Sequence, residues 1–405
     1  MDVKAIIAQA EDSGFGINHL PYGSGNKLSE NSNHILVRIS DYCLSLTELE
    51  IRGYFQNLLT EPLFSTEYLN TFMEAGISVW DSVRDRLSSD LQKKEIPQVL
   101  RDSFYPLSSF RLQLPVKVGD YTDFYASKAH ATKVGRLFRG EENALHPNWD
   151  KMPIAYHGRS SSIIESGDPI YRPKGQILID GNPVLDFTQQ LDFELEIGFF
   201  TGKANSRGSI INISDAENHI FGFSLVNDWS ARDIQRWEYV PLGPFLGKSF
   251  ATTISHWITP IQALYPFRCK NPNQHTHTLD YLKLQNESHF DITFEVLVNG
   301  YTISHSKFEE LYWSPSQMLA HHTINGCPIN AGDLLASGTI SGWRENEYGC
   351  LLEKNEAGKT PLTFENMERI WLEDGDEVSL KAYCKNKDAY LVFGEVTGQI
   401  QKYIS

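Results

Sequence analysis

A seven-residue segment in which apolar and acidic side chains alternate, residues 191–197, constrains the fold most strongly. Side chains of a β-strand point to opposite faces with a period of two, so its four apolar residues would share one face and its three acids the other. These acids are Asp192, Glu194 and Glu196. They would repel one another unless a divalent cation, a basic cluster or shared protons relieved the repulsion. The alternative is a solvated outer face of a sheet, although the apolar residues 198–200 favour a buried strand.

Bulk properties narrow the classes of function. The 405 residues, 41% of them hydrophobic, suffice for two domains, or for one large domain with a smaller one. A net charge of −15 argues against a general nucleic-acid or anionic-membrane surface and is compatible with cation binding. The 18 Tyr, 22 Phe and 8 Trp favour β-rich packing and aromatic-lined pockets.

The cysteines and the chain start bear on cellular location. The five cysteines are far apart and form no Cys-x-x-Cys pair, which argues against a disulfide scaffold and a zinc knuckle. No secretory signal is visible at the start. No stretch approaches about 18 uninterrupted apolar residues, the length of a membrane-spanning helix. We therefore expect a cytoplasmic protein that does not contact a membrane.

Two parts of different composition follow one another, with a boundary predicted near residue 118. In the first part we predict two short strands and two amphipathic helices, at residues 34–39, 42–46, 68–80 and 83–91. After Pro115 the chain becomes rich in Gly, Tyr and charged residues. We therefore predict an N-terminal β domain with a helical segment over residues 1–118 and a larger domain over residues 119–405.

The larger domain is predicted to be mainly β, because Gly, Pro, Asn and Asp punctuate it frequently. Strands are predicted at residues 177–179, 191–200, 219–226, 292–298 and 390–396. We also expect a helix at residues 316–325 and a turn that opens a strand at residues 374–378. The predicted fold class is mainly β with some α, mixed and mainly antiparallel, rather than a doubly wound α/β sheet.

A dense polar segment, residues 119–132, holds the first candidate for catalysis. It carries Asp120, Asp123, two tyrosines and His130. Histidine is the side chain best suited to act as a base near neutral pH. His130 is therefore a candidate base, and a purely structural histidine is the alternative.

The second candidate segment follows a predicted strand. Asp228, Arg232 and Gln235 are spaced so that a helical turn would place them on one side. An acid, a guanidinium and an amide could together hold a cation and an oxyanion. The alternative is a capped helix with an ordinary Asp–Arg pair.

A third candidate is a polar loop bracketed by glycines, residues 337–342, after a predicted buried strand. Its backbone N–H groups and Thr339 could approach a ligand closely, whereas the alternative is an ordinary surface turn. Downstream, we interpret Glu353, from the sequence alone, as a plain exposed acid.

The kind of chemistry follows from the residue types that are present. No Gly-x-Ser-x-Gly motif occurs, which argues against a serine hydrolase. A histidine near acids points to an activated water instead. The candidate metal ligands are carboxylates, which favour Mg²⁺ or Ca²⁺ over zinc.

Together these segments resemble the fumarylacetoacetase (fumarylacetoacetate hydrolase) family. The similar segments are residues 18–23, 120–132, 138–140, 191–196, 227–235, 237–250 and 332–342. The resemblance implies a small SH3-like β-barrel N-terminal domain, a large mixed β-roll C-terminal domain and a homodimer. It also implies a metal-dependent hydrolase that cleaves a carbon–carbon bond of 4-fumarylacetoacetate to give fumarate and acetoacetate, the last step of tyrosine degradation.

The resemblance also implies a role for each matching residue. The positions that would contact the Ca²⁺ or Mg²⁺ ion are Asp123, Glu194, Glu196, Asp228, Lys248 and Thr252. An ammonium cannot ligate a cation, so Lys248 could do so only through its backbone carbonyl. His130 would activate water, and Glu353 would orient His130.

The remaining implied roles concern the substrate, a small diketo acid. The residues that would stabilise the oxyanion and the leaving group are Arg232, Gln235 and Lys248. Those that would hold the substrate are Tyr125, Arg139, Gln235, Tyr239 and Thr339. Two alternatives stay open: an acylpyruvate or related diketo-acid hydrolase of the same superfamily, and a non-catalytic cation-binding protein. The role of Asp192, as an acid that supports the ligands or a solvated one, is open too.

Overall fold

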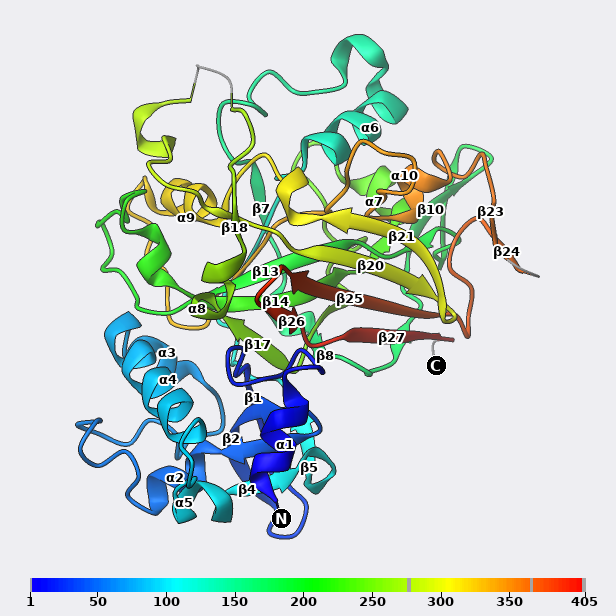
Figure 1. Ribbon diagram of the computed structural model, residues 1–405. Coiled ribbons are helices and arrows are strands. Elements are labelled where there is room, and N and C mark those ends of the chain that lie inside the picture. Colours follow the sequence, from blue (N-terminus) through cyan, green and yellow to red (C-terminus); the bar gives the residue numbers. More distant parts are fainter. Residues whose placement is uncertain (1, 275–277, 365–366, 403–405) are drawn as a thin grey trace.

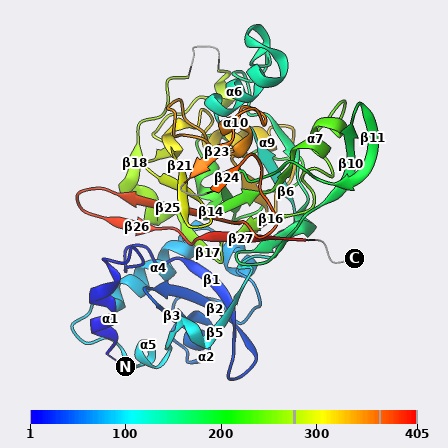
Figure 2. The same cartoon turned by 90° about the vertical axis from the view of Figure 1, so that its right-hand side faces the viewer.

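The computed structural model describes residues 2–274, 278–364 and 367–402. The first 118 residues form α1 (Val3–Ala10), β1 (Tyr22–Lys27), β2 (Ser32–Ile39), β3 (Tyr42–Ser45), α2 (Leu46–Ile51), α3 (Asn70–Glu74), α4 (Ile77–Leu91), α5 (Gln98–Asp102), β4 (Phe104–Pro106) and β5 (Phe110–Gln113). These elements lie together at one end of the molecule in both views (Figures 1 and 2). The two strands predicted in this part are confirmed. The region predicted as two helices is helical, but the break is misplaced: it lies between α3 and α4, at residues 75–76, and α4 runs without interruption from Ile77 to Leu91.

The rest of the chain is mainly β. Up to residue 231 it forms β6 (Tyr121–Phe124), α6 (Lys128–Arg139), β7 (Ala155–His157), β8 (Ile163–Glu165), β9 (Ile170–Tyr171), β10 (Lys174–Ile179), β11 (Asn182–Phe187), β12 (Leu191–Asp192), β13 (Leu195–Thr201), β14 (Ile220–Asp228) and β15 (Ser230–Ala231). Next come α7 (Arg232–Glu238), β16 (Thr252–Ile254), β17 (Trp257–Pro260), α8 (Ile261–Leu264), β18 (Arg268–Cys269), β19 (His289–Phe290), β20 (Thr293–Val298), β21 (Tyr301–Lys307) and α9 (Pro315–Thr323). The chain ends with β22 (Leu334–Ala336), α10 (Leu351–Lys354), β23 (Leu362–Phe364), β24 (Met367–Arg369), β25 (Glu377–Lys385), β26 (Tyr390–Val392) and β27 (Val396–Gln401).

Two large sheets organise the described residues. The main path of the larger sheet is β4-β3-β2-β1-β17-β14-β13-β22-β6-β7, and β5, β8 and β16 pair at its side. The smaller sheet runs β21-β20-β25-β27-β9, with β26 on β25. Most pairings are antiparallel, but β22 and β6 run parallel. The predicted class, mainly β with some α, is confirmed.

The larger sheet crosses the predicted boundary at residue 118. Tyr22 and Gly23 of β1 pair with Ile258 and Trp257 of β17. Only a glycine fits at position 23, since a Cβ there would lie 2.6 Å from the Trp257 ring. In the described part of the chain no pairing joins β4 to β5, so the N-terminal strands do not close into a barrel.

An aromatic core joins the N-terminal helices to the same sheet. Phe221 of β14 contacts Tyr22, Phe72 of α3 and Trp80 of α4, with ring centroids 5.2–5.7 Å apart. All four side chains are buried. Edge and tilted ring contacts add to the hydrophobic stabilisation, so the helices pack rigidly on the back of the sheet that supports the site described below.

Two strand predictions need correction. The segment at residues 191–200 is two strands, not one: β12 pairs with β15, whereas β13 pairs with β14 and β22. The break falls at Glu194, whose N–H donates to the Asn227 side chain and whose C=O accepts from the Asp228 N–H. The segment at residues 390–396 is likewise divided between β26 and β27. A hydrophobic pattern does not reveal the first break, because residues 191–200 are all buried.

Two further properties can be read from the described residues. All five cysteines are free thiols. None of the helices in this part of the chain has both the length and the apolar character needed to span a membrane.

Candidate active site

Four acids from three strands and a connecting residue meet inside the larger sheet. Asp123 lies on β6, Glu196 on β13 and Asp228 at the end of β14, while Glu194 lies just before β13. Each offers a carboxylate oxygen, and these oxygens lie within 4.8 Å of one another. All four residues are at most 5% exposed, so a solvated outer face is excluded. The four acids predicted as metal ligands are thus brought together.

The electrostatics of this cluster suit a hard cation. Asp123 Oδ1 and both carboxylate oxygens of Glu196 are buried and accept no hydrogen bond from the described residues. Burial, and then the neighbouring carboxylates, raise the pKa of Glu196 and of Asp123 well above the ordinary values. Oxygen atoms with free lone pairs, in a site that disfavours four negative charges, are what Ca²⁺ or Mg²⁺ takes as ligands. The residues therefore fit a divalent cation.

Two basic side chains flank the acids on one side. The Lys248 ammonium donates to Asp228 Oδ2 at 2.6 Å and also to Glu194 Oε2. Arg232 Nη1 lies 2.6 Å from Glu194 Oε1. Burial alone would raise the pKa of Glu194, but Lys248 and Arg232 outweigh it and lower that pKa to about 2. The Lys248 side chain is thus a donor to two of the acids and not a metal ligand.

Thr252 supports the cluster from the neighbouring strand. The register of β14 and β16 sets Asp228 opposite Thr252. The Thr252 hydroxyl donates to Asp228 Oδ1 at 2.9 Å. This hydrogen bond orients the Asp228 carboxylate. Direct ligation of the metal by Thr252 stays a prediction.

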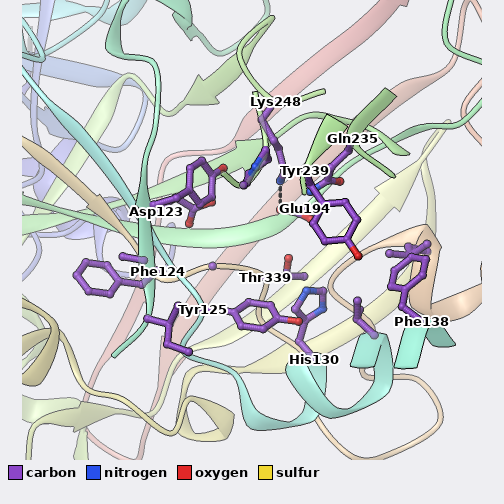
Figure 3. A pocket seen from close by; sticks show the side chains of 18 of the residues that line it. Asp123, Phe124, Tyr125, His130, Phe138, Glu194, Gln235, Tyr239, Lys248 and Thr339 are labelled. Atoms are coloured by element: carbon purple, nitrogen blue, oxygen red, sulfur yellow. Dashed lines mark hydrogen bonds and ion pairs between the residues drawn. The ribbon is translucent and has the colours of Figure 1, made fainter. Parts of the chain in front are cut away.

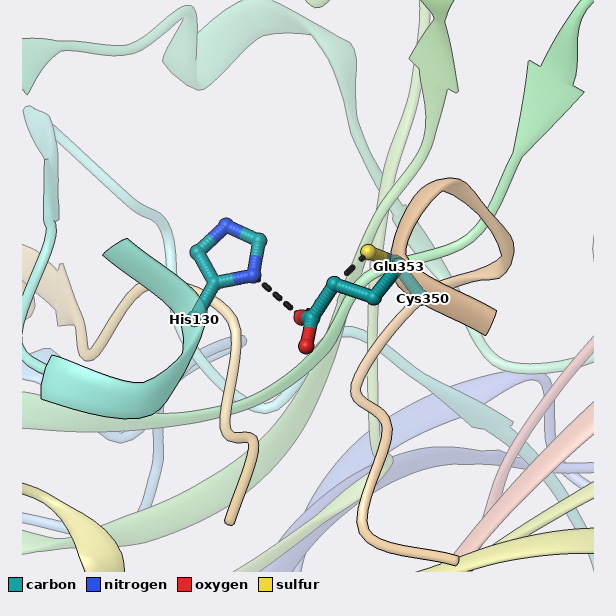
Figure 4. Close-up of side chains that lie close together, drawn as sticks. All are labelled: His130, Cys350 and Glu353. Carbon is teal, nitrogen blue, oxygen red and sulfur yellow. Dashed lines mark hydrogen bonds and ion pairs between the residues drawn. The ribbon is translucent and has the colours of Figure 1, made fainter. Parts of the chain in front are cut away.

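His130 and Glu353 form a buried pair (Figure 4). Helix α6 begins after Ser127, whose hydroxyl accepts from the His130 backbone N–H and caps the helix. His130 Nδ1 lies 2.5 Å from Glu353 Oε1, and Ser341 Oγ donates to the same oxygen. Lys133 Nζ lies 3.4 Å from the other oxygen of Glu353.

The environment of Glu353 favours the ionised form of this carboxyl group. Burial alone would raise the pKa of Glu353, but His130, and then Lys133 and Ser341, lower it below its ordinary value. An ionised carboxylate only accepts hydrogen bonds, so His130 Nδ1–H is the donor in this pair, and Nε2 is the ring nitrogen that Glu353 does not bind. The interpretation of Glu353 as a plain exposed acid is wrong: it is 5% exposed, because the short helix α10 turns it inward.

A cavity of about 470 Å³ connects the acids with this pair. Figure 3 shows Asp123, Glu194 and Lys248 on one side, His130 and Tyr125 on the other, and Thr339 between them. The lining also includes Arg139, Gln235 and Tyr239. All the predicted site residues except Thr252, Asp228 and Glu353 line the cavity. Asp228 and Glu353 contact the lining residues Lys248 and His130, and Thr252 contacts Asp228.

The candidate substrate-binding residues differ in how firmly they are held. Thr339 is buried in the loop after β22, so the alternative of a surface turn is wrong. Gly338 makes this loop possible, with φ +72° and no room for a Cβ, which would lie 2.1 Å from the Phe124 carbonyl oxygen. The Tyr125 ring packs edge-on against His130. In contrast, Tyr239 is 45% exposed.

The two remaining polar candidates are oriented by hydrogen bonds. Arg139, at the end of α6, donates to the Asn143 and Ala144 carbonyl oxygens. Gln235 Oε1 accepts from Arg232 Nη1 at 3.2 Å. Arg232 and Gln235 both lie on α7, as the sequence spacing predicts. Asp228, which was predicted to share their helical turn, lies on β14 instead.

Sequence reasoning missed one member of the site and misplaced another. The Tyr156 hydroxyl, on the three-residue strand β7, donates to Asp228 Oδ2 at 3.1 Å and lines the cavity. So short a strand has no periodicity that could have revealed it. Asp192 is fully buried, so the alternative of a solvated acid is wrong, and it does not belong to the group of four acids.

Comparisons with known proteins cover almost the whole chain. Residues 18–115 match the family model described as Fumarylacetoacetase N-terminal, and residues 120–401 match Fumarylacetoacetate (FAA) hydrolase C-terminal. The chain belongs to the fumarylacetoacetase family. It is 44% identical over 415 residues to the fumarylacetoacetase of Arabidopsis thaliana and 43% identical over 417 residues to that of Homo sapiens. Each alignment covers 98% of this chain and 98% of the relative.

Solved structures with a similar fold include other hydrolases. Fumarylacetoacetate hydrolase from Exiguobacterium antarcticum matches with a TM-score of 0.57 at 17% identity, over 95% of this chain and 100% of that chain. Maleylpyruvate hydrolase from Sphingobium sp. SYK-6 matches with a TM-score of 0.53 at 14% identity, with the same coverage of both chains. At these identities the likeness concerns the fold alone.

Proposed function

We propose that this protein is a metal-dependent hydrolase that cleaves 4-fumarylacetoacetate to fumarate and acetoacetate, the last step of tyrosine degradation. The observation that carries the proposal is that four buried carboxylates and the His130–Glu353 pair converge on one cavity. Membership of a family whose curated relatives are named fumarylacetoacetase supports the choice of substrate.

The metal would be held by Asp123, Glu194, Glu196 and Asp228. When bound, the cation supplies Lewis-acid polarisation of the diketone oxygens. Both Glu196 oxygens accept no hydrogen bond from the described residues, which supports this assignment. The acidic ligand set favours Ca²⁺ or Mg²⁺, and we propose one of these two ions.

His130 would activate the water. Its Nε2 takes a proton from water as the water oxygen bonds to the carbonyl carbon on the fumaroyl side, while the Glu353 carboxylate stabilises the imidazolium. The carbon–carbon bond then breaks, its electron pair goes to the acetoacetate carbon, and that carbon takes up a proton, which balances the proton that His130 accepted from water when the imidazolium returns to its neutral form. A base with one nitrogen fixed by a buried carboxylate keeps the other directed at the reacting water.

Three donors would stabilise the negative charge that develops on oxygen: Arg232, Gln235 and Lys248. Arg232 Nη2 is buried and has no hydrogen-bond partner in the described part of the chain, so it keeps a donor for a substrate oxygen. The Lys248 ammonium has three N–H groups, and its bonds to carboxylates of the described residues use two of them.

We propose that five residues hold the substrate's carboxylate and keto oxygens. They are Tyr125, Arg139, Gln235, Tyr239 and Thr339. Arginine suits a terminal carboxylate, and the hydroxyl and amide groups suit keto oxygens.

Several finer features belong to the same proposal. The end of one family match at residue 115 and the start of the next at residue 120 support a boundary near residue 118. On that division, residues 1–118 form an SH3-like domain and residues 119–405 a β-roll domain. A cytoplasmic location stays a prediction from the sequence.

A homodimer is supported by an apolar surface beside the cavity. The hairpin β10–β11, which projects at the edge of Figure 2, carries exposed apolar side chains, and Trp237 Nε1 donates to Gln176 of the hairpin. The exposed apolar residues of this surface are Leu178, Ile179, Val184, Leu185, Trp237, Val240, Leu242, Phe245 and Leu246. Leu242 is 96% exposed, and a concentration of exposed apolar side chains is typical of a subunit interface.

The proposed reaction is tested with chelator-treated protein and added Mg²⁺ or Ca²⁺. We expect fumarylacetoacetate to be consumed only with the metal, giving fumarate and acetoacetate in equal amounts. Acylpyruvates serve as the comparison substrates. A higher kcat/KM for an acylpyruvate would favour the related hydrolase, and bound metal without turnover of any diketo acid would favour a cation-binding protein.

A further inference from the structure

We propose that Asp192 is a positioning residue that holds Arg232 and Glu353 in fixed relation to one another across the cavity. The expected effect on kcat rests on the proposed function, whereas the positioning itself does not. Asp192 is fully buried at the end of β12, and both of its carboxylate oxygens are used. Oδ2 accepts from Arg232 Nε at 2.9 Å and from the Leu352 N–H at 3.0 Å, and Oδ1 accepts from the Leu351 N–H at 2.8 Å.

On one side Asp192 holds helix α10. The first N–H groups of a helix have no partner within it, and the residue before α10, Cys350, provides no side-chain cap. Asp192, which lies on the distant strand β12, accepts hydrogen bonds from two of these N–H groups. Glu353 follows Leu352 directly, so the placement of this four-residue helix determines where the Glu353 carboxylate meets His130.

On the other side Asp192 aims the guanidinium of Arg232. Its Nε is bound by Asp192 and its Nη1 by Glu194 at 2.6 Å. A guanidinium is planar, so fixing two of its nitrogens fixes the direction of the third. The third nitrogen, Nη2, has no partner in the described part of the chain. One carboxylate therefore sets both the oxyanion donor and the support of the base.

The test compares Asp192→Asn with a matched control. Asn keeps the size but replaces one acceptor oxygen with a donor. Oδ2 accepts from Arg232 and Leu352, and Oδ1 accepts from Leu351 and Phe193, so two N–H groups lose their acceptor whichever oxygen is replaced. Asp376→Asn is the control, because Asp376 is also buried and also binds an arginine, Arg369, away from the cavity. We expect kcat to fall about 100-fold for Asp192→Asn, as for a slight misplacement of catalytic groups, and by less than about threefold for Asp376→Asn.

A double-variant comparison separates positioning from general destabilisation. In a Glu353→Gln background, part of the loss caused by Asp192→Asn should disappear, since residues that act through one another are not additive. The inference is overturned if Asp192→Asn lowers kcat no more than Asp376→Asn does. It is also overturned if the fold-loss of kcat in the double variant equals the product of the fold-losses in the Asp192→Asn and Glu353→Gln single variants.

Two further measurements keep the inference testable if activity or folding is lost. In a crystal structure of Asp192→Asn we expect the distance from Glu353 to His130 Nδ1 to exceed about 3.5 Å, the limit of a hydrogen bond. If the Glu353–His130 distance is unchanged in this variant, the inference is overturned, whatever the activity of the wild type. If the wild type proves inactive on fumarylacetoacetate, only the proposed function is contradicted. If Asp192→Asn does not fold, Leu351→Pro removes one N–H at a helix position that tolerates proline, and Leu351→Ala is its control. Equal kcat for these two variants would overturn the inference.

Discussion

Replacing His130 with alanine should lower kcat for fumarylacetoacetate by about 10²–10⁴-fold, the usual contribution of a general base. The reason is geometric: the His130 imidazole is buried in the cavity and is oriented by the Glu353 carboxylate, 2.5 Å from its Nδ1. KM should change far less, because the residues proposed to hold the substrate remain. Steady-state kinetics with saturating metal measure both constants.

A control for this variant is His305→Ala. The His305 side chain is 55% exposed and lies away from the cavity, so its loss should leave kcat within about twofold of the wild type. Should His130→Ala retain more than about a tenth of the wild-type kcat, the assignment of His130 as the base would be wrong.

Replacing Glu196 with glutamine should weaken binding of Ca²⁺ or Mg²⁺ by at least about 100-fold, since even outer partners of a metal site typically contribute 10–100-fold. Neither Glu196 oxygen accepts a hydrogen bond from the described residues, so metal ligation is the interaction that the side chain would lose. Calorimetric titration of the chelator-treated protein measures the affinity directly. Glu309→Gln, at an exposed acid, is the matched control and should bind the metal like the wild type.

In the metal-free protein we expect the same substitution to raise the thermal stability. Without the cation the four acids repel one another, so Glu196→Gln should melt at a higher temperature than the metal-free wild type. Added metal should raise the melting temperature of the wild type and not that of the variant. Equal metal-induced shifts in both proteins would contradict the assignment of Glu196 as a ligand.

Much of the site could be predicted from local sequence patterns. The alternation of residues 191–197 indicated acids that need a positive partner, and Glu194 and Glu196 do lie in one cluster. The same pattern could not separate Asp192 from them, because the chain breaks at Glu194 and sends Asp192 into a different strand pair. A two-residue period describes side-chain direction only as long as the strand continues.

Other parts of the site depend on pairings between distant segments. The parallel register of β6 with β22 brings Asp123 beside the loop that carries Thr339, more than 200 residues later in the chain. Glu353 lies on a four-residue helix, too short for any periodicity, so its burial could not be inferred from the residues around it. Such placements follow from tertiary packing, and only the family resemblance pointed to them in advance.

The hydrogen bonds between β1 and β17 make the two matched segments parts of a single sheet. If the first 118 residues were removed, β17 would become an unprotected edge with a row of unpaired backbone groups, next to the newly uncovered Phe221 and Ile258. An exposed apolar edge of this kind recruits other strands and promotes aggregation. The N-terminal region therefore acts as the edge protection of the catalytic sheet, which gives a physical reason for a long leading segment that contributes none of the proposed site residues.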